Sequence, residues 1–199
     1  MILPAMGFWD RLSAQLSQPS GTFGKVVAAA MNRGNRTMNA RAIEHLGIRP
    51  GDRVLDLGFG GGVTLQPLTA AGATVSGVDR AADMVGAARR AHPGLDLREG
   101  DVYALPFADD GFDAVLSVNT VYFWRDLPAA LMEIRRVLAP GGRLVLGIRD
   151  PSAMRKVSRE IFTVRPPGDV ADAVGRAGFT GAHLDTAAGG RVHYATGTS

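Results

Sequence analysis

The chain has 199 residues and a formal net charge of +3, and 46% of its residues are hydrophobic and 21% charged. This size fits one ordinary domain, and the composition excludes a wholly disordered chain and a dedicated nucleic-acid binder. The sequence contains no cysteine, so disulfides, thiolate metal sites and cysteine nucleophiles are excluded. No apolar run approaches the roughly 20 residues that span a bilayer, and we expect a soluble, cytoplasmic protein.

Residues 1–49 are predicted to form an N-terminal helical cap segment ahead of the main domain. Hydrophobic spacing predicts helices at 8–17, 26–31 and 37–46, and the last of them stops at Gly47. Basic residues outnumber acidic ones in this segment. We interpret the excess as a solvated surface, and the alternative is binding of an anionic substrate or of RNA.

Residues 50–199 are predicted to form a single α/β domain. Short β-branched runs alternate with alanine-rich helical runs, which is the spacing of successive βαβ crossovers. Two strands around Gly189-Gly190 then predict an antiparallel C-terminal hairpin. The fold class is therefore a Rossmann-like doubly wound sheet of seven strands, mostly parallel, with helices on both faces. Strands are expected at 53–57, 74–78, 96–99, 114–118, 143–148, 181–187 and 191–196, and helices at 63–71, 82–91, 127–138 and 169–177.

Carboxylates and glycines collect where the predicted parallel strands end. The first strand ends in Asp56 and a glycine-rich turn over 58–62, the second in Asp79, the third in Asp101 and the fourth in Asn119. Parallel strands bring these ends to one edge of the sheet, where ligands bind near the topological switch point. Helix N-capping explains Asp79 or Asp101 taken singly, but the carboxylates together favour a nucleoside site.

The kind of nucleoside follows from charge and spacing. Asp79 lies near the distance from the glycine turn at which an acidic residue binds ribose hydroxyls in dinucleotide folds. The NAD fingerprint needs glycine or alanine at the sixth position counted from Gly58, and this chain has Val63 there. A carboxylate beneath the turn, Asp56, repels pyrophosphate and attracts an ammonium or sulfonium. A cationic cofactor is therefore favoured, and an NAD-dependent oxidoreductase is the weaker alternative.

Five stretches in the middle of the chain resemble the class I S-adenosylmethionine-dependent methyltransferases, specifically the UbiE-like or type 11 methyltransferase domain. The resemblance covers about residues 50–150 in the family's order, and it implies S-adenosylmethionine as the co-substrate. The matching stretches are Val54–Gly62, Val75–Asp79, Glu99–Phe107, Phe112–Ser117 and Glu133–Leu144.

The resemblance also implies a role for each residue on the methionine side of the cofactor. Asp56 would hold the methionine ammonium, and Gly58 and Gly60 would let the turn pass beneath the cofactor. Asn119 would contact the methionine portion through its backbone. In the N-terminal segment, Arg36 or Asn39 is in a position to reach the methionine carboxylate.

On the nucleoside side the resemblance implies four further contacts. Asp79 would bind both ribose hydroxyls, and Arg80 would flank the adenine. Asp101 would accept a hydrogen bond from the adenine N6 amine, and the backbone of Val102 would meet the ring.

Acceptor-side candidates follow the fourth and fifth strands. Tyr122 and Trp124 offer aromatic faces to an apolar acceptor, and Arg149 ends the fifth strand on the same edge. Packing against the next helix explains Phe123 and Trp124 equally well. No catalytic residue is assigned, because methyl transfer gains mainly from alignment of the reactants. The four histidines are expected at surface or tail positions and share no metal-ligand spacing, so no metal is predicted.

The leading functional hypothesis is methyl transfer to the oxygen, nitrogen or carbon of a small-molecule acceptor. An RNA or nucleic-acid methyltransferase is an alternative, although Asn119–Tyr122 keeps only the outer residues of the expected Asn-Pro-Pro-Tyr motif. A non-catalytic S-adenosylmethionine-binding protein is another. The resemblance implies that the N-terminal segment lies as a lid over the cofactor. This lid and the tail after the fifth strand are short, which predicts a compact or open acceptor pocket. A homodimer partner is one way to complete such a pocket.

Overall fold

The structure is a computed structural model that describes residues 36–154 and 163–199. The helices expected at 8–17 and 26–31 lie outside the described residues. The strands are β1 (Arg53–Leu57), β2 (Thr74–Asp79), β3 (Asp96–Glu99), β4 (Phe112–Val118), β5 (Leu138–Arg149), β6 (Thr180–Ala187) and β7 (Val192–Thr198). The helices are α3 (Arg36–Leu46), α4 (Leu65–Ala70), α5 (Ala82–Ala91), α6 (Leu127–Val137) and α8 (Pro167–Arg176), with 3₁₀ turns η1 (Val121–Phe123), η2 (Pro151–Ala153) and η3 (Ala188–Gly190).

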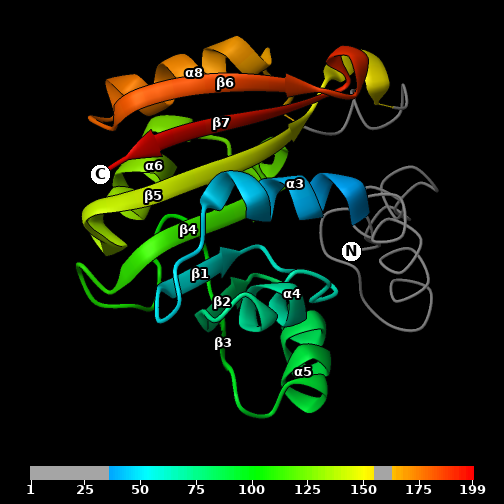
Figure 1. Cartoon of the computed structure of the whole chain (residues 1–199), viewed down its shortest axis with the longest axis vertical. Helices are drawn as coiled ribbons and strands as arrows, with labels where there is room; N and C mark the ends of the chain where they lie inside the picture. Colours follow the sequence, from blue (N-terminus) through cyan, green and yellow to red (C-terminus); the bar gives the residue numbers. More distant parts are fainter. Residues whose placement is uncertain (1–35, 155–162) are drawn as a thin grey trace, which may run out of the picture.

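All seven strands join one sheet in the order β3-β2-β1-β4-β5-β7-β6 (Figure 1). The first five strands pair in parallel, and β7 runs antiparallel to both β5 and β6. The predicted fold class, including the antiparallel hairpin, is therefore confirmed. The strand order reverses between β1 and β4, so the topological switch point lies between their carboxyl ends.

One strand begins earlier than the sequence predicted. Leu138 already pairs with Phe112, and regular pairing with β4 resumes only at Arg143 after a shift in register. The residues between them, which we expected to form a turn before the strand, are thus an irregular stretch within β5. Gly141 adopts a φ of 77° there, a conformation that favours glycine, which explains why the sequence indicated the end of a helix followed by a turn.

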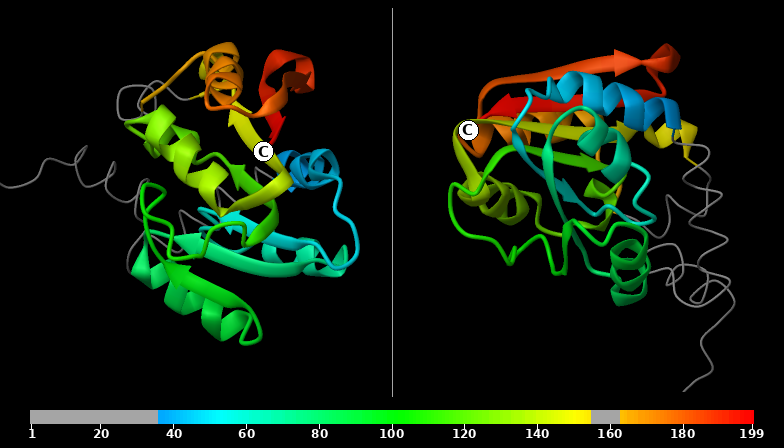
Figure 2. Two further views of the ribbon diagram at one scale, coloured as in Figure 1. Left: turned by 90° about the vertical axis from the view of Figure 1, so that its left-hand side faces the viewer. Right: turned by 60° about the horizontal axis from the view of Figure 1, so that its bottom comes forward.

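Two hydrophobic clusters fill the two faces of the sheet. On one face α6 and α8 cover the strands, with Leu131, Ile134 and Val174 among the buried side chains. On the other face α3, α4 and α5 contribute Leu46, Leu65 and other apolar residues. Figure 2 shows helices on both sides of the twisted sheet. None of the described helices is long and apolar enough to cross a membrane.

Helix α3 is fixed across the centre of the sheet, against β4, β5 and β7. Tyr194 Oη donates a 3.2 Å hydrogen bond to the Met38 carbonyl, and Arg143 Nε donates to the Leu46 carbonyl at 2.9 Å. These bonds hold both ends of the helix. As a result Asn39, near its first turn, lies at the cavity described below.

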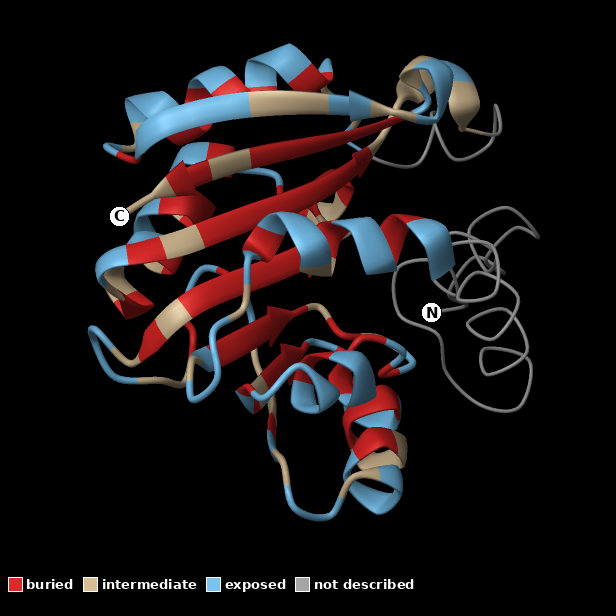
Figure 3. Cartoon of the chain, viewed as in Figure 1, coloured by how far each residue is buried: buried red, intermediate tan, exposed pale blue. Residues whose placement is uncertain are grey.

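Burial is greatest in the middle of the sheet. Figure 3 shows β1, β4, β5 and β7 largely buried and the edge strand β6 largely exposed. The central strands therefore form a rigid base, and their carboxyl ends are held in fixed positions.

Candidate functional site

A cavity of about 430 Å³ opens at the carboxyl ends of the central strands. This volume lies within the range of small-molecule sites. All eight residues that we predicted for cofactor binding line it, and they come from the ends of β1, β2 and β4 and from the segment after β3. They are Asp56, Gly58, Gly60, Asp79, Arg80, Asp101, Val102 and Asn119. The structure thus brings them together, and the role of each stays a prediction.

The glycine turn after β1 is held close to the sheet. Gly58 and Gly60 have φ values of 76° and 51°, a region that glycine enters without steric cost. The Gly58 amide donates a 2.7 Å hydrogen bond to the Val78 carbonyl. The buried ring of Phe59 packs against Gly77, so closely that a Cβ on Gly77 would lie only 2.7 Å from Cδ1 of that ring. The turn is therefore anchored from below by an aromatic side chain and by β2.

We expect Gly58→Ala to destabilise the protein by roughly 1–3 kcal/mol. The new Cβ would overlap with Cγ2 of Thr120 and lie 3.3 Å from its Cβ, in addition to the positive φ. Thr120 cannot turn away freely because its hydroxyl is hydrogen-bonded to that of Ser117. Urea unfolding measures the change, and Gly94→Ala, which meets neither constraint, is the matched control. Equal unfolding midpoints for the two variants would contradict this account of the turn.

Asp56 is the most deeply placed carboxylate of the site. Its residue is only 3% exposed, and its Oδ2 accepts a hydrogen bond from Thr64 Oγ1. Burial raises the pKa of Asp56 to about 7, and the hydroxyl of Thr64 and the nearby Asp79 act in opposite directions on it. Sequence reasoning missed Thr64, because nothing in its spacing separates it from an ordinary residue at the start of α4.

Asp79 ties the glycine turn to the end of β2. Its Oδ2 accepts from the Gly60 amide at 2.7 Å, and its Oδ1 accepts from the Ala81 amide at 2.9 Å. Burial raises the pKa of Asp79, while these amides and Arg80 favour the charged form. An ionised carboxylate has about four acceptor sites, so lone pairs remain for hydroxyl groups of a ligand.

The segment after β3 forms a further wall of the cavity. The Asp101 side chain accepts from the Tyr103 amide at 3.2 Å, and Val102 is buried beside it. Tyr103, which is 40% exposed, also lines the cavity, and its hydroxyl accepts a 3.0 Å hydrogen bond from the Asp126 amide. We had not predicted Tyr103 as a site residue.

Asn119 occupies the left-handed region with a φ of 59° at the end of β4. Its amide donates a 2.9 Å hydrogen bond to the Gly147 carbonyl, which fixes the conformation. Asparagine tolerates this region better than most residues, and such strained positions cluster at functional sites. The backbone conformation of Asn119 thus indicates a functional position at the end of β4, independently of the sequence motif.

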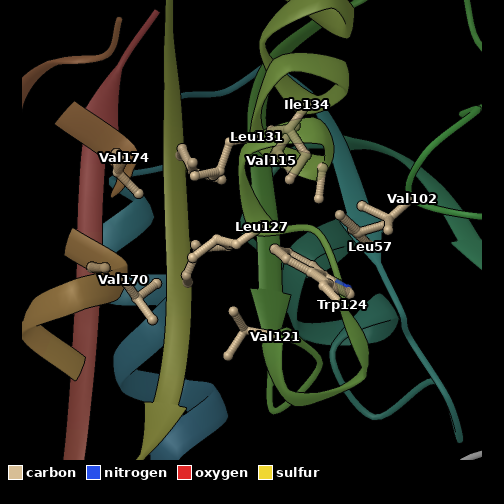
Figure 4. Close-up of a cluster of buried hydrophobic side chains, with 14 of the residues drawn as sticks. Leu57, Val102, Val115, Val121, Trp124, Leu127, Leu131, Ile134, Val170 and Val174 are labelled. Carbon is tan, nitrogen blue, oxygen red and sulfur yellow. The ribbon is translucent and has the colours of Figure 1, made fainter. Parts of the chain in front are cut away.

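The acceptor-side candidates separate in the structure. Trp124 lines the cavity and also packs in the cluster beside α6, near Leu57 and Val102 (Figure 4). Tyr122 and Arg149 are not among the lining residues. Tyr122 is 4% exposed and its hydroxyl donates to the Arg149 carbonyl at 3.1 Å, so it links η1 to the end of β5. Burial raises the pKa of Tyr122 well above its ordinary value.

One histidine lies in the C-terminal tail, as expected, but not at the surface. His193 is buried in β7, where its ring nitrogens bond Thr186 Oγ1 at 3.0 Å and Asp150 Oδ2 at 3.2 Å. Pairing of β7 between β5 and β6 encloses it, which the sequence pattern of a tail hairpin did not show. Within residues 36–154 and 163–199, no group of three or more His, Asp or Glu side chains is arranged to hold a metal ion.

The charge distribution fits a cofactor with a cation and several hydrogen-bond donors. Asp56, Asp79 and Asp101 converge on one cavity, and the deepest of them has no cationic side chain hydrogen-bonded to it among the described residues. A buried carboxylate of this kind repels phosphate and stabilises an ammonium or sulfonium. The residues present therefore fit S-adenosylmethionine better than a dinucleotide.

Comparison with known sequences shows which family the chain resembles. A family model described as a methyltransferase domain matches residues 55–146. A Bacillus subtilis protein, uncharacterized methyltransferase YdaC, is 34% identical over 134 residues, which are 65% of this chain and 72% of the relative. The demethylmenaquinone methyltransferase of Renibacterium salmoninarum is 38% identical over 52% of this chain and 44% of its own. The malonyl-[acyl-carrier protein] O-methyltransferase of Erwinia pyrifoliae is 36% identical over 67% and 55%. The chain thus spans about half the length of these last two relatives.

Solved structures share the fold at low sequence identity. A chain of the complex between the Haloferax volcanii Trm112 methyltransferase activator and the putative methyltransferase aligns with a TM-score of 0.77 at 24% identity, over 86% of this chain and 95% of that one. The [4+2]-cyclase SpnF aligns with a TM-score of 0.67 at 21% identity, over 78% and 61%. The domain match covers the glycine turn and the strands that build the cavity, and the Bacillus subtilis relative is covered over most of its length. The chain therefore belongs to the S-adenosylmethionine-dependent methyltransferases.

Proposed function

We propose that the protein transfers a methyl group from S-adenosylmethionine to the oxygen, nitrogen or carbon of a small-molecule acceptor. The observation that carries the proposal is the cavity in which Asp56 lies buried beneath the glycine turn while Asp79 and Asp101 line the adjoining strand ends. This arrangement offers a carboxylate to each of three donor groups of such a cofactor. Family membership and the named relatives support the same activity.

The proposal gives each cofactor-binding residue the role that the family resemblance implies. Asp56 would hold the methionine ammonium, Asp79 the ribose hydroxyls and Asp101 the adenine amine. Asn39, which lines the cavity from α3, would bind the methionine carboxylate. Arg80 and Arg125 also line it and supply positive charge.

Bound S-adenosylmethionine supplies a methyl group already activated by a sulfonium. The chain then has to align the acceptor and exclude water. Three aspartates of the cavity are assigned to the cofactor, and no histidine, lysine or glutamate lies among the cavity-lining residues that the structure describes. This favours an acceptor atom that is nucleophilic near neutral pH without a protein base.

The acceptor side of the cavity favours an apolar molecule. Phe123 and Trp124, which follow β4, line the cavity. Two relatives carry names that refer to demethylmenaquinone and to malonyl-[acyl-carrier protein], so acceptors differ within the family. A homodimer that completes the acceptor pocket remains part of the proposal, and light scattering of the purified protein tests it.

Titration of the purified protein with S-adenosylmethionine and with NADH tests the cofactor assignment. Tight binding of NADH without binding of S-adenosylmethionine would overturn it. Transfer of a labelled methyl group into cell-extract metabolites then tests the activity. The structural likeness to a [4+2]-cyclase makes this second step necessary, because the fold alone does not fix the reaction. Cofactor binding without formation of S-adenosylhomocysteine would favour a non-catalytic or different role.

Thr64→Val is expected to weaken S-adenosylmethionine binding at pH 7 by about fivefold, since a hydrogen bond of about 1 kcal/mol to the carboxylate is lost. The Thr64 hydroxyl lowers the pKa of Asp56 against the effect of burial, so its removal leaves more of Asp56 protonated at neutral pH. The deficit should shrink at pH 9, where the carboxylate is charged in both proteins. Thr69→Val, on the same helix but bonded to the Leu65 carbonyl, is the control. A deficit that does not change with pH would contradict the explanation.

A further inference from the structure

Residues 101–107, which we call the adenine-side loop, contribute residues 101–103 to the cavity wall and are hydrogen-bonded to side chains of helix α6. Glu133 Oε1 accepts a 2.7 Å hydrogen bond from the Leu105 amide. Arg136 donates to the Leu105 carbonyl at 3.1 Å through Nη2 and to the Phe107 carbonyl at 3.0 Å through Nη1. Two side chains one helical turn apart thus bind three backbone groups of the loop.

Glu133 and Arg136 also bind each other, so their geometry is fixed. Arg136 Nε lies 2.8 Å from Oε2 of Glu133 and Nη2 lies 2.7 Å from Oε1, and Nη1 bonds Asp109 at 2.6 Å. Hydrogen bonding to Arg136 lowers the pKa of Glu133, and hydrogen bonding to Glu133 and Asp109 raises that of Arg136. The pair therefore stays ionised throughout the pH range in which a protein works.

The adenine-side loop has little regular structure of its own. Within the loop there are an isolated bridge between Asp101 and Ala104 and two short-range hydrogen bonds, from the Tyr103 amide to Asp101 and from the Phe107 amide to the Leu105 carbonyl. Its other contacts come from neighbouring elements. Arg98, from β3, lies 4.5 Å from the centre of the Phe107 ring and bonds the Pro106 carbonyl. At the other end the Tyr103 hydroxyl accepts from the Asp126 amide, at the N-cap of α6. Helix α6 therefore contacts the loop near both of its ends.

The first residues of the loop, Asp101, Val102 and Tyr103, line the cavity. We propose that Glu133 and Arg136 are positioning residues, which fix the backbone at Leu105 and Phe107 so that Asp101 is aligned with the adenine amine. The inference rests on the proposed function, because it takes Asp101 as the adenine contact. Without the side chains of Glu133 and Arg136, the buried Leu105 amide loses its acceptor and the loop is less ordered. Ligand binding then has to order the loop, which weakens the affinity.

A purely structural role predicts a different result. An ion pair this close to the surface contributes little to stability, and its loss would affect all ligands of the cavity alike. A positioning role predicts a selective loss of recognition of the adenine amine. The ratio of affinities for S-adenosylhomocysteine and S-inosylhomocysteine, in which an oxygen replaces that amine, separates the two.

The test measures both dissociation constants for the full-length wild type and for Glu133→Ala, Arg136→Gln and Arg136→Lys. We expect the wild type to prefer the adenosyl ligand at least tenfold, because the inosine oxygen faces a carboxylate. The three variants should bind the adenosyl ligand 5- to 30-fold more weakly and the inosyl ligand nearly as before, so the ratio falls towards one. Glu133→Gln should recover part of the ratio, since its amide oxygen still accepts from Leu105.

Arg135→Gln is the matched control. Arg135 stands immediately before Arg136 in α6, is the same residue type and makes no hydrogen bond to the loop. It should leave the ratio unchanged. Equal losses for both ligands, or wild-type binding in all variants, would overturn the positioning role. A wild type that binds neither ligand overturns the proposed function itself, whereas one that binds both equally overturns the contact between Asp101 and the amine. If Glu133→Ala fails to fold, Arg136→Lys and Glu133→Gln decide the question.

Discussion

Replacing Asp79 with alanine is expected to weaken S-adenosylmethionine binding roughly 10- to 150-fold. Hydrogen bonds from ribose hydroxyls to a carboxylate are worth roughly 1.5–3 kcal/mol, and about 1.4 kcal/mol corresponds to a factor of ten. The variant also leaves the amides of Gly60 and Ala81 without their acceptor, which loosens the glycine turn from β2. Isothermal titration calorimetry at pH 8 measures the change.

Two further variants show whether the loss belongs to the ribose contact. Asp79→Asn keeps the shape and one acceptor oxygen, so its affinity should lie between those of the wild type and the alanine variant. Asp83→Ala removes an exposed aspartate four residues along the chain that does not line the cavity, and should bind normally. A folded Asp79→Ala protein with wild-type affinity would refute the ribose role.

The strand-end residues could be predicted from the sequence because their positions depend on local repeats. Alternation of strands and helices fixes a parallel sheet, and parallel strands bring Asp56, Asp79 and Asn119 to one edge. The glycine turn needs only conformations that glycine alone enters easily, so it is visible in the sequence as well. These features require no knowledge of how distant side chains pack.

The remaining contacts depend on tertiary structure and could not be read from the chain. Glu133 meets the Leu105 amide across 28 positions, and nothing in the spacing indicates that α6 lies behind that loop. Tyr122, which we predicted on the acceptor side because it follows β4, donates its hydroxyl to the Arg149 carbonyl at the end of β5, a contact that its spacing did not indicate. His193 became buried only because β7 pairs between two other strands. Long-range pairing decides all three.

Asp56→Asn is expected to remove tight cofactor binding and at the same time stabilise the ligand-free protein above pH 7. Burial raises the pKa of Asp56 from 3.8 to about 7, so the folded protein holds the proton between these values while the unfolded chain has released it. The free energy of unfolding of the wild type therefore falls as pH rises through this window, and the contribution of Asp56 levels off above pH 7. Asparagine has no such titration, so the variant avoids the cost of the buried charge, which is roughly 4 kcal/mol for a rise of the pKa from 3.8 to about 7.

Thermal unfolding of the two proteins from pH 5 to pH 9 measures this difference, which should grow up to pH 7 and then stay constant. Each kcal/mol corresponds to about 2–4 °C for a chain of this size. Cofactor binding should show the opposite preference, because an ammonium is stabilised only by the charged carboxylate. Wild-type affinity should rise with pH up to about 7, and the variant should bind at least tenfold more weakly at pH 8 with a flatter profile. A variant that loses stability at every pH would show that Asp56 supports the fold rather than ligand binding. A buried carboxylate that serves binding is expected to destabilise the ligand-free protein, because functional sites often reduce stability.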